Sequence, residues 1–416
     1  MRKTKIICTL GPATDGILPE MIKAGMNVAR MNFSHGSHEE HKARMDAVKA
    51  ARKELGMPVG IMLDTKGPEI RTKTYKDGKI EIVEGQEFTL TTRDIEGDNT
   101  IVSITYEGLP NDVQPGTRIL IDDGLVAFEV EEIKNGTDIV CKALNGGPLS
   151  NRKSINVPGI KLNMKFISDK DREDIEFGLT QDIDFIAASF TRCAQDVRDI
   201  KAILKAHGKE DVEIICKIEN MEGVNNIQEI LDEANGVMVA RGDLGVELPA
   251  EVIPNTQRRI VEKCICAKRP VIIATQMLYS MVKSPRPTRA EVSDVASAIY
   301  ERVDAVMLSD ETAMGDFPVQ SVETMARIAR EIERDETHFK PMIDMDMVSV
   351  NHEITAQLAR SAVRASTNLP IKYVVLDTKT GRTGRYLAAF RGRKTVMAVC
   401  YQLHAQRILA LSYGVV

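Results

Sequence analysis

The sequence predicts an α/β protein built on a closed barrel of eight parallel strands. Short apolar runs rich in β-branched residues alternate with amphipathic, helix-like segments, which is the pattern of parallel strands joined by crossover helices. An open, doubly wound sheet has the same pattern, but the count of eight and the lack of an early Gly-x-Gly-x-x-Gly turn favour a (β/α)8 TIM barrel. The expected strands are residues 4–10, 27–33, 59–64, 184–190, 213–218, 236–240, 271–275 and 304–308.

Segments with apolar residues at helical spacing separate most of these runs. Such a segment can bury one face against a sheet and leave the other face in solvent. The expected helices are residues 39–55, 169–179, 194–206, 227–234, 254–267 and 289–301.

One connection between the expected barrel strands is much longer than the others and has a different pattern. In residues 67–157 the apolar residues recur with a period of two, and the pairs Asp77-Gly78 and Asn135-Gly136 mark turns. We therefore expect an all-β domain inserted at the barrel mouth, where it can act as a lid. Its expected strands are residues 79–83, 87–91, 118–121, 127–133 and 137–143.

A third unit is expected after residue 340. The methionine-rich residues 341–347 are typical of a linker, and the final Gly-Val-Val resembles the start of a strand. We expect residues 341–416 to form a partial α/β regulatory domain that is cut short, and residues 1–66 with 158–340 to form the barrel. The expected elements of the third unit are helices 354–367, 383–390 and 402–411 and strands 373–376 and 395–399.

The composition argues against several classes of function. Lys and Arg total 55 and Asp and Glu total 60, so the net charge is −5, with no basic footprint for nucleic acid or a membrane surface. No apolar run approaches the ~20 residues of a membrane-spanning helix, and the run near the N-terminus is too short for a signal peptide. The seven cysteines lack zinc-site spacing, so we expect reduced thiols and a cytoplasmic protein.

Polar residues gather where the expected barrel strands end. Enzymes with this fold place their catalytic groups at the carboxyl ends of the strands. One charged residue at a strand end is usually a solvated loop residue, but six strand ends of the same character indicate a site. The segments are residues 30–35, 64–68, 217–220, 241–245, 275–276 and 309–312.

Two carboxylates at these ends are candidates for a metal site. Glu219 and Asp243 follow neighbouring strands and suit a hard divalent cation, because Mg²⁺ typically takes one or two carboxylates plus substrate oxygens. Structural ion pairing with Lys217 and Arg241 is the alternative. The Gly-Asp-Leu-Gly turn that begins at Gly242 offers backbone N–H groups to a substrate carboxylate.

Cations and oxygen donors complete this end of the barrel. Arg30 and Lys217 place positive charge beside the expected metal, as phosphoryl transfer requires. Four further side chains are hard oxygen donors with one formal charge between them, which suits a monovalent cation better than a divalent one. They are Asn32, Ser34, Asp64 and Thr65.

Seven motifs occur along the chain. They are KTKIICTLGP (3–12), GMNVARMNFSHG (25–36), LDTKGPEIRT (63–72), KIEN (217–220), MVARGDLGVE (238–247), ATQML (274–278) and PRPTRAE (285–291). In wording, order and spacing they resemble the pyruvate kinase family, and the resemblance extends over essentially the whole chain. It implies transfer of the phosphoryl group of phosphoenolpyruvate to ADP, giving ATP and pyruvate as the last step of glycolysis, with Mg²⁺ (or Mn²⁺) and K⁺ as cofactors.

The resemblance also implies roles for individual residues. Lys217 would stabilise the transferring phosphoryl group, and Arg30 would contact the substrate phosphate. Glu219 and Asp243 would hold Mg²⁺, while the backbone at Gly242 and Asp243 would bind the substrate carboxylate.

Other residues would serve the enolate, K⁺ and the nucleotide. Thr275 would lie beside the enolate, where a proton is delivered, and Glu69 is the residue type associated with K⁺ dependence. The K⁺ ligands would be Asn32, Ser34, Asp64 and Thr65. The nucleotide contacts would be Asn32, His35, Arg71 and Lys153, the last of them from the lid.

The sequence TKTGRT (378–383) resembles the phosphate-binding turn of the family's sugar-phosphate effector site, although an ordinary helix N-cap has similar residues. The candidate effector residues are Thr378, Thr380, Arg382 and Thr383. The resemblance also implies a homotetramer.

The chain departs from the family pattern at three positions. Asp310 occupies a position where the family usually has Gly, and its carboxylate either weakens nucleotide binding or faces solvent. Tyr279 replaces a common Asp and Lys165 a common Pro, and we expect both on the surface or at an interface.

Two other classes of function stay open at this point. A Mg²⁺-dependent lyase or aldolase acting on pyruvate-like acids has a similar metal site, but it needs no nucleotide residues such as Arg71 and Lys153. An inactive fragment or binding paralogue is the non-enzymatic alternative, motivated by Asp310 and the short third unit.

Overall fold

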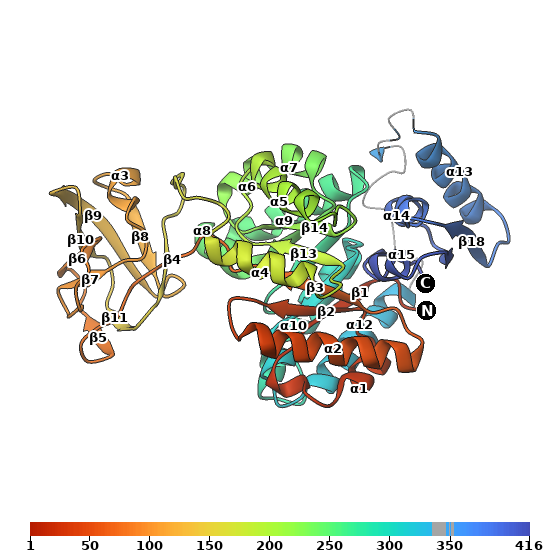
Figure 1. Cartoon of the computed structure of the whole chain (residues 1–416), viewed down its shortest axis with the longest axis horizontal. Coiled ribbons are helices and arrows are strands. Elements are labelled where there is room, and N and C mark those ends of the chain that lie inside the picture. Colours follow the sequence, from red (N-terminus) through yellow and green to blue (C-terminus); the bar gives the residue numbers. More distant parts are fainter. Residues whose placement is uncertain (335–346, 349, 351–352) are drawn as a thin grey trace.

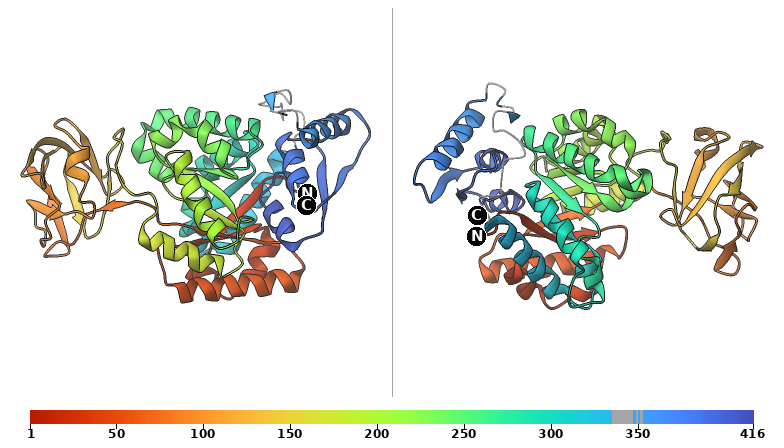
Figure 2. Two further views of the ribbon diagram at one scale, coloured as in Figure 1. Left: turned by 45° about the horizontal axis from the view of Figure 1, so that its top comes forward. Right: turned by 180° about the vertical axis from the view of Figure 1, so that it is seen from behind.

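The computed structural model describes residues 1–334, 347, 348, 350 and 353–416. Three units follow one another along the long axis: a β-rich unit, a central barrel wrapped in helices, and a small α/β unit (Figure 1). The two smaller units lie on opposite sides of the barrel in each view (Figures 1 and 2). The predicted site and the C-terminal unit are therefore separated by the length of the barrel strands.

The central unit is a closed barrel of eight parallel strands, ordered β1-β17-β16-β15-β14-β13-β3-β2. All eight predicted strands are confirmed, with ends that differ from the prediction by at most two residues. They are β1(Lys5–Thr9), β2(Val28–Asn32), β3(Gly60–Asp64), β13(Phe185–Ala188), β14(Glu213–Ile218), β15(Gly236–Ala240), β16(Val271–Ala274) and β17(Ala305–Leu308).

Helices surround the barrel because alternate strand residues point outward and need an apolar cover. The predicted helices are confirmed to within one residue, but the 17-residue helix Pro318–Arg334 and several short helices were not predicted. The helices of this unit are α1(Leu18–Ala24), α2(His38–Leu55), α4(Asp169–Leu179), α5(Ala194–Ala206), α6(Met221–Asn225), α7(Ile227–Glu233), α8(Arg241–Glu247), α9(Ile253–Cys266), α10(Arg289–Tyr300), α11(Asp310–Ala313) and α12(Pro318–Arg334), with 3₁₀ turns η1(Pro12–Thr14), η2(Ala250–Val252) and η3(Tyr279–Val282).

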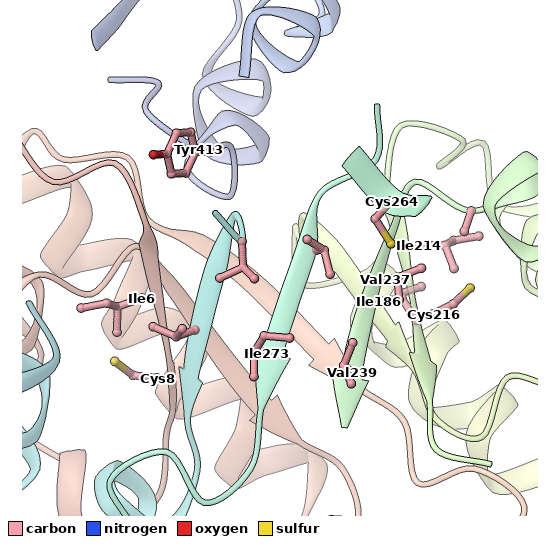
Figure 3. Close-up of a cluster of buried hydrophobic side chains, with 14 of the residues drawn as sticks. Ile6, Cys8, Ile186, Ile214, Cys216, Val237, Val239, Cys264, Ile273 and Tyr413 are labelled. Atoms are coloured by element: carbon pink, nitrogen blue, oxygen red, sulfur yellow. The ribbon is translucent and has the colours of Figure 1, made fainter. Parts of the chain in front are cut away.

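Strand alternation divides the barrel core in two. Outward side chains such as Ile6 and Val237 pack under the helices, and Figure 3 shows part of this layer. Inward side chains such as Ile7, Val28 and Ile215 form a separate buried cluster inside the barrel. Residues that continue the inward series past the last apolar layer must therefore face the barrel mouth.

The inserted unit is all-β, as predicted. It has a seven-stranded sheet ordered β4-β12-β8-β9-β10-β6-β7 and a two-stranded sheet β11-β5, around a core of its own in which Phe88 stacks on Phe128. The sequence did not predict four of the strands, each two to four residues long. The elements are β4(Ile70–Arg71), β5(Lys79–Ile82), β6(Glu87–Thr91), β7(Ile101–Ser103), α3(Leu109–Asp112), β8(Arg118–Ile121), β9(Val126–Lys134), β10(Asp138–Ala143), β11(Gly147–Ser150) and β12(Ser154–Asn156).

The C-terminal unit contains the predicted helix–strand–helix–strand–helix series. Its two strands pair in parallel, and Val415 makes an isolated parallel bridge to Val396. The elements are α13(Ile354–Asn368), β18(Tyr373–Thr378), α14(Arg382–Ala389), β19(Thr395–Cys400) and α15(Leu403–Leu409). Residues 341–346 of the predicted linker, and with them the boundary at residue 340, lie outside the described residues.

The predicted boundaries at residues 66/67 and 157/158 remain predictions, and they fall in the connections from β3 to β4 and from β12 to α4. Within the described residues, no helix has the length and apolar character needed to span a bilayer. All seven cysteines are free thiols, as expected.

Candidate active site at the barrel mouth

A cavity of about 590 Å³ lies at the carboxyl ends of the barrel strands, and this volume is in the range of ligand-binding pockets. Its wall is formed by residues that come from widely separated parts of the chain. The predicted site residues in the wall are Arg30, Asn32, His35, Lys217, Glu219, Asp243 and Thr275. The barrel thus brings most of the predicted catalytic and metal residues to one place.

Lys217 is held at this mouth by three oxygens. It continues the inward series of β14 after Ile215, and its Nζ lies 2.7 Å from Oγ of Ser189, 3.0 Å from Oε1 of Glu219 and 3.1 Å from Oδ1 of Asp64. Burial alone would lower the pKa of Lys217, but the two carboxylates raise it above its ordinary value. The ammonium is therefore charged at every physiological pH.

Arg30 meets the same carboxylate from the other side. Its Nε donates to Oδ2 of Asp64 over 2.6 Å, and its Nη1 donates to Oγ1 of Thr9 over 2.9 Å. Although burial opposes it, the Arg30 guanidinium and the Lys217 ammonium keep the pKa of Asp64 below its usual range. The buried Asp64 carboxylate therefore lies between Arg30 and Lys217 and fixes the positions of both cations in the cavity wall.

Glu219 and Asp243 lie together, which is the arrangement that a shared metal site requires. Burial, opposed by Lys217 and assisted by Asp243, raises the pKa of Glu219 to about 7. Burial also raises the pKa of Asp243, opposed by Lys217 and by a hydrogen bond with Glu219. The backbone N–H of Phe190 donates to Oε2 of Glu219 over 2.6 Å and fixes its orientation. At both carboxyls burial outweighs the nearby Lys217 ammonium, so a further cation would favour their charged forms.

Arg241 does not pair with these carboxylates, so that part of the ion-pairing alternative is wrong. Its guanidinium instead makes two 2.7 Å contacts to Asp294 and donates to the carbonyl of Thr275 over 2.9 Å. Thr275 and Gln276 both have positive φ, 76° and 54°, which is unusual for residues with side chains. Arg241 therefore supports a strained segment at the end of β16.

The expected Gly-Asp-Leu-Gly turn is instead the beginning of a helix. Gly242 and Asp243 occupy the first turn of α8, where backbone N–H groups lack partners within the helix. A Cβ atom at Gly242 would lie 2.9 Å from Cγ2 of Thr275, so this close approach requires glycine. The first turn of α8 and Thr275 are therefore packed directly against each other.

The four predicted K⁺ ligands come from two adjacent strand ends. The β2–β3 register pairs Asn32 with Asp64, and Ser34 donates its backbone N–H to Oδ1 of Asn32 over 3.2 Å. Thr65 is buried, and its Oγ1 accepts from the backbone N–H of Ser189 over 3.1 Å. Both oxygens of Asp64 already contact Arg30 or Lys217. Asp64 would therefore contribute negative charge to a K⁺ site and not an unoccupied oxygen ligand.

The predicted nucleotide residues are not all brought together. His35 lines the mouth cavity, but Arg71 and Lys153 lie on the lid and line neither this cavity nor the adjoining one. Arg71 pairs with Glu69 over 2.8 Å, and Lys153 pairs with Asp122 over 3.0 Å. The adjoining cavity, about 300 Å³, lies between the lid connections and the barrel and shares Asp243 with the first.

The positions that depart from the family pattern separate into two groups. Asp310 begins α11, is exposed, and lines the mouth cavity. Tyr279 is exposed, and Lys165 is an exposed residue paired with Asp169, so neither touches the cavity. Of the three, Asp310 alone can act on a bound ligand there.

The predicted effector residues lie at the far end of the molecule, where a turn leads from β18 into α14. Oγ1 of Thr378 accepts from the backbone N–H of Gly381 over 3.0 Å, and Thr380 is exposed. Arg382 contacts Glu353 over 3.4 Å, and Thr383 is the second residue of α14.

Two polar residues at the mouth were missed from the sequence. Ser189 contacts Lys217, and Thr9 contacts Arg30. Both continue the inward series of their strands, after Ala187 and Ile7 respectively. Extending that alternation by one residue past the last apolar position would have found them.

Family models match nearly the whole chain. The model described as pyruvate kinase, barrel domain, matches residues 1–322, and the model described as pyruvate kinase, alpha/beta domain, matches residues 356–416. The two matches cover the central, inserted and C-terminal units.

Individual relatives agree with the family models. A pyruvate kinase of Bacillus licheniformis is 47% identical over 418 residues, covering all of this chain and 71% of the relative. A pyruvate kinase of Clostridium perfringens is 44% identical over 420 residues, covering 100% of this chain and 88% of the relative. The crystal structure of a pyruvate kinase from Cryptosporidium parvum matches with a TM-score of 0.94 and 40% identity, covering 100% of this chain and 86% of the other. The chain therefore belongs to the pyruvate kinase family of phosphotransferases.

Proposed function

We propose that this chain transfers the phosphoryl group of phosphoenolpyruvate to ADP through the residues at the barrel mouth, in the cytoplasm. One observation carries the proposal: Lys217 and Arg30 share the buried Asp64 in the wall of a cavity that also contains Glu219 and Asp243. Phosphoryl transfer depends mainly on positioned cations that stabilise charge on the migrating group. Two fixed cations beside a pair of carboxylates supply that arrangement.

Lys217 stabilises the transferring phosphoryl group in this proposal, and Arg30 contacts the substrate phosphate. Both side chains are largely buried, and each has at least two oxygen partners that fix its position. Fixed charges need no reorganisation during the reaction, which makes them more effective than mobile ones.

The donor set at Glu219 and Asp243 fits Mg²⁺ or Mn²⁺. Both are hard oxygen donors, and burial raises the pKa of each although Lys217 lies beside them, so a bound cation would stabilise their charged forms. When bound, the ion would neutralise charge on the phosphate oxygens. Among the residues that the structure describes, no group of three or more His, Cys, Asp or Glu side chains is placed to hold a metal, so the other ligands would be substrate and water.

The first turn of α8 and Thr275 would handle the pyruvate part of the substrate. Backbone N–H groups of Gly242 and Asp243 would bind the carboxylate, because the start of a helix favours an anion. Thr275 packs against Gly242 and would lie beside the enolate carbon that receives a proton.

The oxygen donors on β2 and β3 would hold K⁺, and the lid would complete the nucleotide site. Asn32, Ser34, Asp64 and Thr65 provide side-chain oxygens from adjacent strand ends. Arg71 and Lys153 would join Asn32 and His35 when the lid closes over the cavity, since both lie outside it here.

Regulation and assembly are proposed on the family resemblance and on one turn of the C-terminal unit. A sugar phosphate would bind at Thr378, Thr380, Arg382 and Thr383, where a buried Thr378 already shapes the turn at the start of α14. The functional assembly would be a homotetramer.

An assay of pyruvate and ATP formation from phosphoenolpyruvate tests the proposed reaction. We expect product only when ADP, Mg²⁺ (or Mn²⁺) and K⁺ are all present. Pyruvate formed without ADP would indicate lyase chemistry instead. No product from a folded protein under any of these conditions would contradict the proposed function.

A further inference from the structure

The loop of residues 33–37 joins β2 to α2 and carries several of the proposed ligands. It directly follows Asn32 and includes Ser34 and His35, which is exposed at the cavity. Its end is fixed by a capping box, in which Ser37 and Glu40 exchange hydrogen bonds. Within the loop, the backbone N–H of His35 donates to the carbonyl of Asn32 over 3.3 Å.

His41 lies behind the middle of this loop and is buried, with 4% of its surface exposed. Its Nε2 lies 2.8 Å from the backbone carbonyl of His35, and its ring stacks on Phe33 at 4.1 Å between centroids. Gly36, at φ 81°, passes so close that a Cβ atom there would be 3.4 Å from the same nitrogen. His41 therefore contacts Phe33 and His35 and lies close to Gly36.

The chemistry of this contact is a single directed hydrogen bond. A carbonyl oxygen only accepts, so Nε2 of His41 carries the proton and donates to His35. Nδ1 of His41 is buried without a hydrogen-bond partner among the described residues. Among the described residues, the hydrogen bond of the His41 ring is therefore the one to the His35 carbonyl.

We infer that His41 is a positioning residue: its imidazole holds the His35 carbonyl and thereby fixes Ser34 and His35 relative to Asn32 at the end of β2, with Asn32 and His35 in the cavity wall. The inference rests on the proposed function, in which Asn32 and Ser34 bind K⁺ and Asn32 and His35 bind the nucleotide. His41 itself touches no ligand in this scheme. Its loss should weaken K⁺ activation and ADP binding and leave phosphoenolpyruvate binding nearly unchanged, because Arg30 on β2 is fixed by Asp64 and Thr9 and not by the loop.

Three variants separate the hydrogen bond from the ring. His41→Phe keeps the stack on Phe33 and removes the donor, whereas His41→Gln restores a donor without the ring. His38→Phe is the matched control, because His38 is a neighbouring imidazole of α2 that stacks on Phe177 and contacts Asp174. Toward the loop it has a tilted ring contact with Phe33, at 6.0 Å between centroids, which a Phe ring can keep.

We expect His41→Phe to raise the KM for ADP and the half-activating K⁺ concentration about five- to tenfold, as for loss of one hydrogen bond. The KM for phosphoenolpyruvate should change less than twofold. His41→Gln and His38→Phe should remain within about twofold of the parent on all three measures. Unchanged ADP and K⁺ parameters in His41→Phe, or an equal loss for phosphoenolpyruvate, would overturn the inference.

Calorimetry of ADP binding, with Mg²⁺ and K⁺, gives a readout that does not depend on turnover. A parent protein that binds ADP but makes no ATP would contradict the proposed function, while weaker ADP binding by His41→Phe would still support the positioning role. Equal ADP affinity for the parent and His41→Phe, or no ADP binding by either, would overturn it.

Discussion

Buried ion pairs lie at both ends of the barrel, but the two ends use them differently. At the amino ends of the strands, Asp304 contacts both outer nitrogens of Arg391, while Asp184 pairs with Arg407 over 2.6 Å. A third carboxylate, Glu213 at the start of β14, contacts Arg385. The three arginines come from the C-terminal unit, which covers this end of the barrel.

At the carboxyl ends, charge is left for a ligand. Lys217 and Arg30 share Asp64, but Glu219 and Asp243 both have raised pKa values, and all of these except Asp64 line an open cavity. Ion pairs stabilise the fold where each carboxylate has a cationic partner and is covered by another unit. Where the matching is incomplete and a cavity is open, the same residue types are available for chemistry.

The largest effect is expected at the mouth. Lys217→Met removes a fixed cation from the migrating phosphoryl group, so we expect phosphoryl transfer to fall about 10³-fold. Steady-state pyruvate formation measures the loss, and Mg²⁺ binding should persist because Glu219 and Asp243 remain. Near-normal turnover in this variant would refute the role of Lys217.

The second largest effect is expected at the amino ends of the barrel strands, and it concerns stability and not catalysis. Arg391→Met leaves Asp304 buried without its cation, which should cost about 3 kcal/mol in the free energy of unfolding, measured with urea. The kcat of the folded protein should not change. Adding Asp304→Asn removes the unpaired charge and should recover part of the loss. If Arg391→Met alone is as stable as the parent, the Arg391–Asp304 pair does not stabilise the fold.

A smaller effect is expected for Asp310, which adds a carboxylate to the mouth cavity. Asp310→Asn should lower the KM for ADP by about two- to fivefold, because an exposed charge acting on the anionic nucleotide contributes up to about 1 kcal/mol. The gain should shrink at high salt. Asp316→Asn, which removes an exposed carboxylate outside the cavity, is the control. Equal KM values for the parent and Asp310→Asn would show that Asp310 faces only solvent.

The smallest effect is a pH dependence at the covered end. Nδ1 of His404 lies 3.2 Å from Asp184, and this contact, opposed by burial, raises the pKa of His404. A raised folded pKa stabilises the protein fully below the unfolded value of about 6.5, and the stabilisation is lost as pH rises through the folded value.

We therefore expect His404→Gln to lower Tm about one to two degrees more at pH 6 than at pH 9. His207→Gln, at an exposed position of α5's C-terminal end, should show no such difference. A Tm difference between His404→Gln and the parent that is constant with pH would contradict the assignment.

Local pattern was sufficient for the barrel and for most of the site residues. Short apolar runs identified all eight barrel strands, most of which are buried at every residue. Helical spacing identified the long helices of the barrel except α12, because such a helix must bury one face. Parallel strands end at the same rim, so Arg30, Lys217 and Glu219 could be expected to meet from their positions at strand ends alone. The motifs added the family, which the full-length matches confirm.

The tertiary structure decided what depends on partners distant in sequence. Arg241 pairs with Asp294 and not with the metal carboxylates, and Ser189 contacts Lys217. Arg391 and Arg407 of the C-terminal unit pair with carboxylates at the amino ends of the barrel strands. The tertiary structure also supplied the short lid strands, which exist only through pairing with neighbours. Periodicity records which face of an element is buried, whereas the choice of partner depends on how those faces are assembled in space.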